Sequence, residues 1–264
     1  MQLSDLDAVI LAGGLGTRLR SVLPEGTPKC MADISGTPFL AILADRLFRS
    51  GFNRLILATG YGHDRVMDML TPLYTRMSRV EFSMETKPLG TAGAIRKAAL
   101  LIKSDDFLVV NGDTFCDVDY EAILTYHEIT NSIITVACDM EFRHIGTFVA
   151  SKKLIDFIQL IDSGLCGGCG HKWEEHNIGN DYVRECLFCG DCYDYEFNRN
   201  GKVDMAEVFT LLGQRHEPVG WFMTDAPFYD IGDEARLKRF REYWSVRSLK
   251  GGEGRMIGHH KEPV

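Results

Sequence analysis

The sequence predicts an α/β fold, with parallel strands and with helices packed on both faces of the sheet. The chain has 264 residues, of which 45% are hydrophobic and 25% charged, as in ordinary globular proteins with a sizeable core. Between Ala8 and Cys138, short apolar runs alternate with longer segments of helical spacing, which is the rhythm of strand–helix–strand units. A glycine-rich loop follows the first apolar run, where sheets of this class hold their ligands.

Six apolar runs are expected to be strands. They are Ala8 to Leu11, Arg54 to Ala58, Val80 to Met84, Phe107 to Asn111, Ile133 to Ala137 and, near the C-terminal end, Val219 to Met223. Each is short and almost continuously apolar, which is typical of strands that are buried on both faces of a parallel sheet.

Helical segments lie between these runs. The first has a clear start signal, with Thr37 as N-cap, Pro38 at the first helical position and apolar residues at helical spacing from Phe39 onward. The other expected helices are His63 to Leu70, Ala92 to Ile102, Tyr120 to Thr130, Lys152 to Ile161, Met205 to Leu212 and Glu234 to Ser245. The Gly-rich, polar residues 249–264 are expected to form a flexible tail.

A cysteine-rich segment, residues 164–197, interrupts the α/β rhythm and shows neither helical nor strand periodicity. Within it, Cys166 and Cys169 form one Cys-x2-Cys pair, and Cys186 and Cys189 form a second. The spacing between the pairs is close to that of structural zinc sites, in which four thiolates enclose the metal. We therefore predict a small zinc-ribbon-like insert that contains a structural Zn²⁺ ion.

Other ligand sets and other chemistries stay open for this insert. Cys192 and His171, or His176, are alternative zinc ligands. Disulfide bonds are the competing explanation, but they are rare in the reducing cytosol. A set of residues also falls at the spacing of a calcium loop, although the first position lacks Asp and no entering helix is expected; it consists of Glu196, Asn198, Asn200, Gly201, Asp204 and Glu207.

The charge balance argues against a nucleic-acid-binding protein. The formal net charge is −8, and no run of Lys or Arg is longer than a pair. The stretch from Cys166 to Glu196 carries two Lys/Arg residues against seven Asp/Glu residues, so the insert is expected to be structural or to contact protein. No apolar run approaches the roughly 20 residues needed to span a bilayer, and Met1 to Ile10 lacks the features of a signal peptide. These observations predict a cytoplasmic protein without a membrane partner.

The glycine-rich loop is the strongest candidate for a ligand site. It runs from Leu11 to Leu19, and its glycines allow the backbone to approach phosphate groups closely. Arg18 and Lys29 would add the positive charge that stabilises a departing pyrophosphate. The loop matches neither the G-x-x-x-x-G-K-[ST] pattern nor the dinucleotide fingerprint, since Leu19 stands where the latter needs its third glycine. A tight turn without a ligand is the competing interpretation.

The string Ala12-Gly13-Gly14-Leu15-Gly16-Thr17-Arg18-Leu19, followed by Pro28-Lys29, resembles the signature of the sugar-1-phosphate nucleotidyltransferases. The resemblance implies a Rossmann-like, three-layer fold of the glycosyltransferase-A type, with a mostly parallel mixed sheet. It also implies that the loop binds a nucleoside triphosphate, that Arg18 contacts the phosphates and that Lys29 activates the α/β-phosphate region.

Three further segments resemble this family. Glu85 to Ala94 is similar to its base-recognition segment, and the strings around Asp113 and Asp230 are similar to its two metal-carboxylate motifs. The resemblance thus implies a catalytic Mg²⁺ ion on Asp113 and Asp230, with Arg18, Lys29 and Asp113 as the catalytic residues. The nucleotide-binding residues that it implies are Leu11, Ala12, Gly13, Gly14, Gly16, Thr17, Arg18, Pro88, Leu89, Gly90, Thr91 and Gly93.

Within the family, the strings Leu19 to Val22, Pro38 to Leu40 and Asn111 to Asp119 are most similar to the D-glycero-α-D-manno-heptose 1-phosphate guanylyltransferases. This implies a transfer from GTP to the heptose or to mannose 1-phosphate, with release of pyrophosphate. Two alternatives stay open, namely a uridylyl-, thymidylyl- or adenylyltransferase acting on a hexose 1-phosphate, and a catalytically silent sugar-nucleotide sensor or scaffold. A homo-oligomeric state is also left open.

One part of the chain departs from the family pattern. After Cys138 the sequence reaches Gly146 to Val149 almost at once, whereas relatives carry a longer segment with a Glu-Lys pair near the sugar phosphate. Arg143 and His144 are polar candidates for the acceptor site, although each is more readily explained as a surface residue. We therefore expect a nucleotidyltransferase domain formed by residues 1–163 and 198–248, interrupted by the insert at 164–197.

Overall fold

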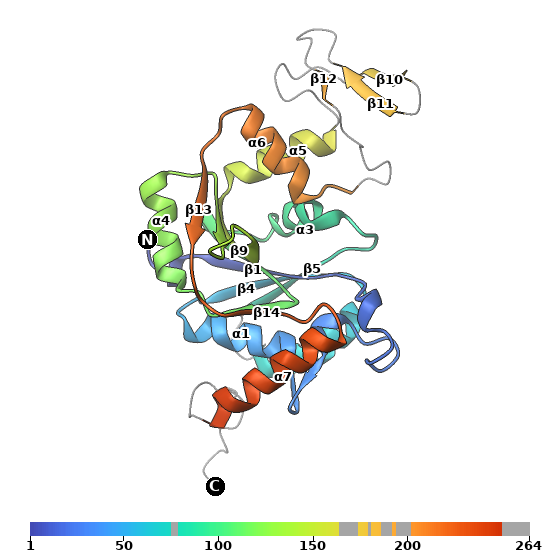
Figure 1. Ribbon diagram of the computed structural model, residues 1–264, viewed down its shortest axis with the longest axis vertical. Coiled ribbons are helices and arrows are strands. Elements are labelled where there is room, and N and C mark those ends of the chain that lie inside the picture. Colours follow the sequence, from blue (N-terminus) through green and yellow to red (C-terminus); the bar gives the residue numbers. More distant parts are fainter. Residues whose placement is uncertain (75–78, 164–173, 179–180, 186–191, 194–201, 250–264) are drawn as a thin grey trace.

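A mixed, mostly parallel sheet of seven strands forms the centre of the molecule (Figure 1). The computed structural model describes residues 1–74, 79–163, 174–178, 181–185, 192–193 and 202–249. The strand order is β13-β8-β9-β6-β1-β4-β5, and β9 runs antiparallel between β6 and β8, whereas the other six strands run parallel to one another. This arrangement confirms the predicted α/β class and the mostly parallel mixed sheet.

Six of the seven strands agree with the predicted apolar runs to within one residue at each end. Their bounds are β1 (Asp7–Ala12), β4 (Arg54–Thr59), β5 (Val80–Met84), β6 (Asp106–Asn111), β8 (Ile134–Cys138) and β13 (Val219–Met223). The agreement has a simple cause in β1 and β6, whose central residues are almost wholly buried. A continuous apolar run is the sequence pattern that burial on both faces requires.

The seventh strand, β9 (His144–Ser151), was not predicted. Six consecutive residues of β9 are buried, and the strand forms a hairpin with β8. Asp139 closes that hairpin, because its carboxylate accepts hydrogen bonds from the amides of Glu141 and Arg143 at 2.9 Å. The short segment between Cys138 and His144 is thus the turn between two neighbouring strands.

The helices form where the spacing predicted them, with differences at their ends. Their bounds are α1 (Phe39–Arg49), α2 (His63–Tyr74), α3 (Gly90–Ala98), α4 (Tyr120–Thr130), α5 (Lys153–Ser163), α6 (Met205–Gln214) and α7 (Glu234–Leu249). The predicted start of the first helix was wrong by one residue. Pro38 is the N-cap and not the first helical residue, because Thr37 and Pro38 (β3) pair with Asp33 and Ile34 (β2). The end of α3 was also placed too late, since the helix stops at Ala98.

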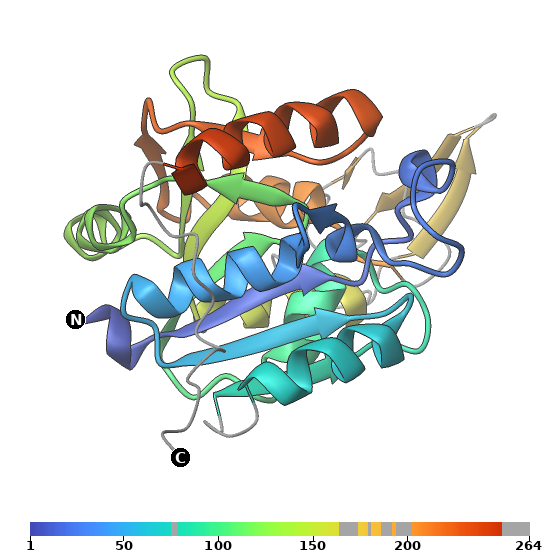
Figure 2. The same cartoon turned by 90° about the horizontal axis from the view of Figure 1, so that it is seen from below.

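Two helical layers cover the sheet, as the three-layer prediction required. On one face, α1, α2 and α7 pack over Ala8, Ile10 and Ala12 of β1. On the other face, α3, α5 and α6 pack over Val9, which points the opposite way from the same strand. Figure 1 shows the two helical layers above and below the sheet. Figure 2 shows the molecule from below, with α1 in blue and α7 in red on the near face.

Several short elements lie outside the large sheet. Two short strands, β7 (Thr114–Cys116) and β14 (Phe228–Asp230), pair antiparallel, and three 3-10 turns cover Leu3–Asp5, Thr17–Leu19 and Lys29–Met31. The cysteine-rich segment contains a separate three-stranded antiparallel sheet formed by β10 (Glu174–Ile178), β11 (Asp181–Glu185) and β12 (Cys192–Tyr193). The sequence of this segment shows no strand periodicity, so these strands could not be predicted from it.

Candidate active site

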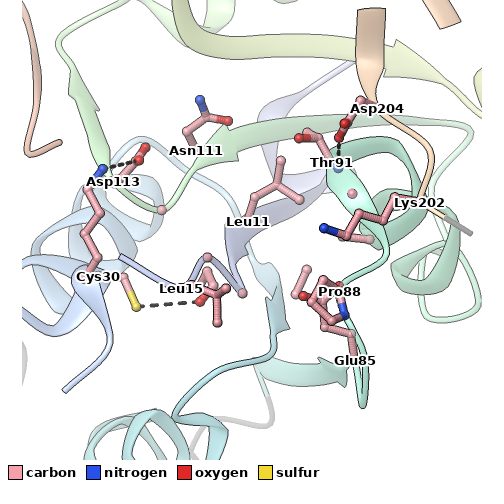
Figure 3. Close-up of a pocket in the computed structure, with 18 residues that line it drawn as sticks. Leu11, Leu15, Cys30, Glu85, Pro88, Thr91, Asn111, Asp113, Lys202 and Asp204 are labelled. Carbon is pink, nitrogen blue, oxygen red and sulfur yellow. Dashed lines mark hydrogen bonds and ion pairs between the residues drawn. The ribbon is translucent and has the colours of Figure 1, made fainter. Parts of the chain in front are cut away.

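A cavity of about 400 Å³ opens at the carboxyl edge of the parallel strands (Figure 3). Leu11 and Asn111, which pair in register at the ends of β1 and β6, line it. The lining residues are Leu11, Ala12, Gly13, Gly14, Leu15, Lys29, Cys30, Ala58, Glu85, Pro88, Gly90, Thr91, Ala94, Asn111, Gly112, Asp113, Lys202 and Asp204. Parallel strands end at the same edge, so the fold brings together motifs that lie about 100 residues apart in the sequence.

The glycine loop wraps one side of the cavity and leads into the 3-10 turn Thr17–Leu19. Gly16 adopts a left-handed conformation with φ of 57°. A Cβ atom at Gly16 would lie 2.8 Å from the Cβ of Lys29, so glycine is required both by the backbone conformation and by the close approach of this side chain. The loop conformation and the position of Lys29 are therefore coupled.

The structure pairs two of the three predicted catalytic residues. The ammonium of Lys29 donates a hydrogen bond of 2.6 Å to Oδ2 of Asp113, and the hydroxyl of Thr114 lies 3.1 Å from the other carboxylate oxygen. The Lys29 side chain is 17% exposed and that of Asp113 is 39% exposed, so the pair is accessible to a ligand in the cavity. A cation and a carboxylate are thus held side by side at the end of β6.

Asp230 lies next to this pair, although it does not line the cavity itself. The pairing of β7 with β14 sets Asp230 opposite Thr114, and the amide of Ile231 donates to the carbonyl of Asp113 at 2.9 Å. Partial burial alone would raise the pKa of Asp230. The hydrogen bonds from Arg236 and from the Gly232 amide, with the charges of Arg236 and Lys29, outweigh that effect and lower its pKa.

Asp113 and Asp230 form a donor set that suits a hard divalent cation. In this structure each carboxylate lies 2.6 Å from a cationic side chain, Lys29 or Arg236, which shows that both positions attract positive charge. No group of three His, Cys, Asp or Glu side chains able to hold a metal occurs among the described residues. Two carboxylates fit Mg²⁺, which commonly takes one or two of them and completes its shell with substrate phosphates and water.

The opposite side of the cavity contains Glu85, a residue that the sequence analysis included in a motif but did not assign to the site. Glu85 directly follows β5, and its carboxylate accepts a hydrogen bond of 3.2 Å from the amide of Leu89. Partial burial raises the pKa of Glu85, and the Leu89 amide and the charges of Lys97 and Lys202 only partly oppose that rise. Figure 3 shows Glu85 and Pro88 together on this side.

A second part of the site that sequence reasoning missed is the segment 202–204. Val203 makes two backbone hydrogen bonds with the start of α3. Its amide donates to the carbonyl of Leu89 at 2.8 Å, and its carbonyl accepts from the amide of Gly93 at 3.1 Å. Asp204 accepts a third, of 3.0 Å, from the amide of Thr91. Lys202 and Asp204 thereby reach the cavity from a position more than 100 residues further along the chain.

Five other predicted residues lie near the cavity without lining it. Gly16, Thr17 and Arg18 continue the glycine loop, and the side chain of Arg18 is exposed, with no hydrogen bond or ion pair to any described residue. Leu89 and Gly93 contribute backbone groups to the contact with Val203. Arg18 is therefore free to meet a ligand that extends from the glycine loop.

The remaining candidates fall outside this cavity or outside the described residues. Arg143 is bound to Asp139 at 2.7 Å with its side chain 65% exposed, and neither it nor His144 lines the cavity, as their interpretation as surface residues predicted. Cys166, Cys169, His171, Cys186 and Cys189 lie outside the described residues. Among the helices that the structure describes, none is both long enough and apolar enough to cross a bilayer.

A glycine loop and a lysine–aspartate pair at one cavity, with the carboxylate of Asp230 beside them, define an α/β enzyme of the phosphoryl- or nucleotidyl-transferring class. The family model described as Nucleotidyl transferase matches residues 7–144, and the chain belongs to this family. The recognition of this family from the sequence is thus confirmed.

Several relatives within the family are guanylyltransferases by name. A D-glycero-alpha-D-manno-heptose 1-phosphate guanylyltransferase from Aneurinibacillus thermoaerophilus is 31% identical over 233 residues, which cover 86% of this chain and 93% of the relative. The crystal structure of HddC from Yersinia pseudotuberculosis has a TM-score of 0.64 and 28% identity, covering 90% of this chain and 99% of that one, and the same protein is also known in complex with GMP-PN. A Xenopus tropicalis mannose-1-phosphate guanylyltransferase catalytic subunit beta is 36% identical over 126 residues, covering 47% of this chain and 35% of the relative.

Proposed function

We propose that the protein is a Mg²⁺-dependent guanylyltransferase that joins GTP to a sugar 1-phosphate and releases pyrophosphate. The acceptor is D-glycero-α-D-manno-heptose 1-phosphate or mannose 1-phosphate, the substrates in the names of the relatives above. The observation that carries the proposal is the cavity that joins the glycine loop and the Lys29–Asp113 pair to Glu85. It offers a phosphate-binding end and a base-binding end within one site.

Glu85 supports the choice of guanine. Guanine presents two neighbouring donors, the N1–H and the N2 amino group, to which the two oxygens of one carboxylate are complementary. Adenine has an acceptor at N1, and uracil and thymine have a single N3–H between two carbonyl oxygens that a carboxylate would repel. A carboxylate at this position therefore favours GTP over ATP and over the uridine and thymidine nucleotides.

The proposed chemistry needs no protein nucleophile. A phosphate oxygen of the sugar 1-phosphate attacks the α-phosphorus of GTP in line, the bond from that phosphorus to the bridging oxygen breaks, and pyrophosphate leaves. The amides of the glycine loop, with Arg18 and Lys29, would hold the phosphates and offset the charge that grows on the pyrophosphate. Asp113 and Asp230 would hold a Mg²⁺ ion, which supplies positive charge beside the α-phosphate.

The experiment that tests this function is an assay of pyrophosphate release with Mg²⁺. The four ribonucleotides and dTTP are each combined with mannose 1-phosphate, the manno-heptose 1-phosphate and glucose 1-phosphate, and a reaction without sugar phosphate measures background hydrolysis. Release that requires both GTP and a manno-configured sugar is the expected result. Release with another nucleotide would replace the base assignment, and nucleotide binding without any turnover would contradict the enzyme and favour a sensor.

A further inference from the structure

The segment 202–204 is built into the substrate site by its own backbone. Val203 is 3% exposed in the core that also contains Ala92 and Ile95 of α3, and its two backbone hydrogen bonds join it to the segment that opens that helix. A Cβ atom on Gly90 would lie 2.5 Å from the carbonyl oxygen of Val203, so the two segments are in close contact. Lys202 directly precedes Val203, which is buried and held by two backbone hydrogen bonds. The backbone of Lys202 is therefore fixed in position at the cavity wall.

Lys202 is one of two cations on that wall. Among the described lining residues, the positive side chains are Lys29 and Lys202, and Lys29 is already 2.6 Å from Asp113. Lys202 has no carboxylate within 4.0 Å among the described residues, and Figure 3 shows its side chain directed into the cavity, on the side opposite Asp113. An ammonium group held there, without a carboxylate partner in the part of the chain that the structure describes, is available to an anionic ligand.

The charges of the two proposed substrates indicate which anionic group Lys202 would bind. The cavity wall carries two lysines against three carboxylates, Glu85, Asp113 and Asp204, yet the proposed reaction brings a triphosphate and a phosphomonoester into it. The glycine loop, Arg18 and Lys29 account for the triphosphate, whereas no other described cation on the wall is left for the phosphomonoester. A neutral base would not offset the cost of removing a lysine from water, but a dianionic phosphate would.

We propose that Lys202 binds the phosphate group of the sugar 1-phosphate acceptor. The inference rests on the proposed function and deepens it, because it assigns an acceptor contact that neither the β8–β9 hairpin nor Arg143 supplies at this cavity. It also means that the segment 202–204, which precedes α6, takes part in substrate binding.

Steady-state kinetics of Lys202→Met and Lys202→Arg test the assignment in the full-length protein. With the sugar 1-phosphate that the wild-type protein uses best, Lys202→Met should raise the KM for that sugar phosphate by about 10-fold or more, whereas the KM for GTP stays within about twofold. Lys202→Arg keeps the positive charge and should retain most of the acceptor affinity. A rise in the KM for GTP alone would overturn the proposal and assign Lys202 to the nucleotide.

Lys97→Met is the matched control. Lys97 influences the pKa of Glu85 as Lys202 does, but it does not line the cavity. If both Met variants changed the KM for the acceptor equally, Lys202 would act only through the long-range electrostatic effect of its positive charge, and the proposal would be wrong. Binding of a non-hydrolysable GTP analogue to each variant shows that it is folded.

A direct titration separates this proposal from the proposed function. Mannose 1-phosphate and the manno-heptose 1-phosphate are titrated calorimetrically into the wild-type protein and Lys202→Met, in the presence of Mg²⁺ and the GTP analogue. Absent turnover in the wild-type protein would refute the function alone, while acceptor binding that is lost in Lys202→Met would still support the Lys202 contact. Equal binding to both proteins, or no binding to the wild-type protein, would refute the contact.

Discussion

The ammonium of Lys29 lies 2.6 Å from a carboxylate oxygen of Asp113, although 84 residues separate them in the sequence. Lys29 begins a 3-10 turn after the glycine loop, and Asp113 follows β6, so the parallel pairing of β1 with β6 is what brings their segments together. In the proposed reaction Lys29 would bind the phosphates and Asp113 would bind the Mg²⁺ ion, so the contact between them places the phosphate site next to the metal site.

Asp113→Asn should lower kcat of the transferase reaction by about 10²- to 10³-fold, because the amide cannot balance the charge of a divalent cation or of Lys29. The fold should be retained, since Asp113 is partly exposed and Asn has the same shape. Pyrophosphate release measures the loss, and a thermal unfolding curve close to that of the wild-type protein shows that the fold is intact. Near-normal turnover would remove Asp113 from the catalytic set.

Glu85→Gln should weaken the preference for GTP over ATP by about 10-fold, because an amide offers guanine one acceptor where the carboxylate offers two. The comparison of kcat/KM for the two nucleotides measures the change. ITP, which lacks the N2 amino group, is the matched substrate control, since it should lose less in the variant than GTP does. Unchanged selectivity would exclude Glu85 from base recognition.

The raised pKa of Glu85 also predicts a pH effect on nucleotide binding. Protonation removes the carboxylate's capacity to accept two hydrogen bonds, and it begins at a higher pH than for an ordinary glutamate because partial burial favours the neutral form. The KM for GTP should therefore rise as the pH is lowered from about 7 to about 5. The same titration with Glu85→Gln should show no such rise, and an identical rise in both proteins would assign the effect to another group.

Gly16→Ala should lower kcat/KM by about 10- to 100-fold, since it would displace Lys29 from its position beside Asp113. The left-handed backbone at this position adds a cost of about 1 to 2 kcal/mol to the free energy of folding. Gly213→Ala in α6 is the control, because a Cβ atom there has no described atom within 4 Å and alanine favours helix. If Gly16→Ala kept full activity, the loop and Lys29 would not be coupled as described.

The strands and helices could be predicted because each is encoded locally. The central residues of β1 and β6 are continuously apolar. The helix α4 begins at Tyr120 because the carboxylate of Asp119 accepts hydrogen bonds from the amides of Glu121 and Ala122. The start of α1 was misplaced because Thr37 and Pro38 pair with β2, a tertiary contact that overrides the local capping signal. The strand β9 was missed for a related reason, since its pairing with β6 and β8 is a tertiary contact and Gly146 and Thr147 interrupt its apolar run.

Site residues were predicted where a single continuous motif contains them. They were missed where the site depends on contact between two segments that are far apart in the sequence. The glycine loop, Lys29 and Asp113 each belong to a string that is recognisable alone. Asp204 reaches Thr91 across 113 residues, and no local pattern marks Lys202 as a cavity residue. A signal nearby is the capping box at Asp204, which marks the start of α6 directly after residues 202–204.

The zinc-binding insert stays a prediction from the sequence, because Cys166, Cys169, Cys186 and Cys189 lie outside the described residues. We propose that residues 164–197 bind one structural zinc ion and interrupt a nucleotidyltransferase domain of residues 1–163 and 198–248. Elemental analysis of the purified protein should find about one zinc per chain. Cys186→Ser should lose most of it, whereas Cys138→Ser, at a buried cysteine of β8, should retain it. Absence of zinc in the wild-type protein would contradict the insert's assignment.

Asp117 anchors α1 and α7 to the short β7–β14 sheet, and its removal should destabilise the protein. Its carboxylate contacts Arg46 at 2.7 Å and also binds Arg247, and although partial burial would raise its pKa, these two arginines lower the pKa below the ordinary value. Asp117→Asn should lower the free energy of unfolding at pH 7 by about 1 to 3 kcal/mol, measured by urea denaturation.

The lowered pKa of Asp117 fixes the sign of the pH dependence. A carboxylate with a lower pKa in the folded state stabilises the protein above its unfolded-state pKa, and this stabilisation is lost as the pH falls through the folded-state value. The difference in unfolding free energy between wild-type protein and Asp117→Asn should therefore be constant from about pH 7 to about pH 5 and should shrink below about pH 4. Asp105→Asn is the control, because the Asp105 side chain is 99% exposed and only 4.0 Å from Lys152. A difference that did not shrink in acid would mean that Asp117 stabilises the fold through hydrogen bonds that do not depend on its charge.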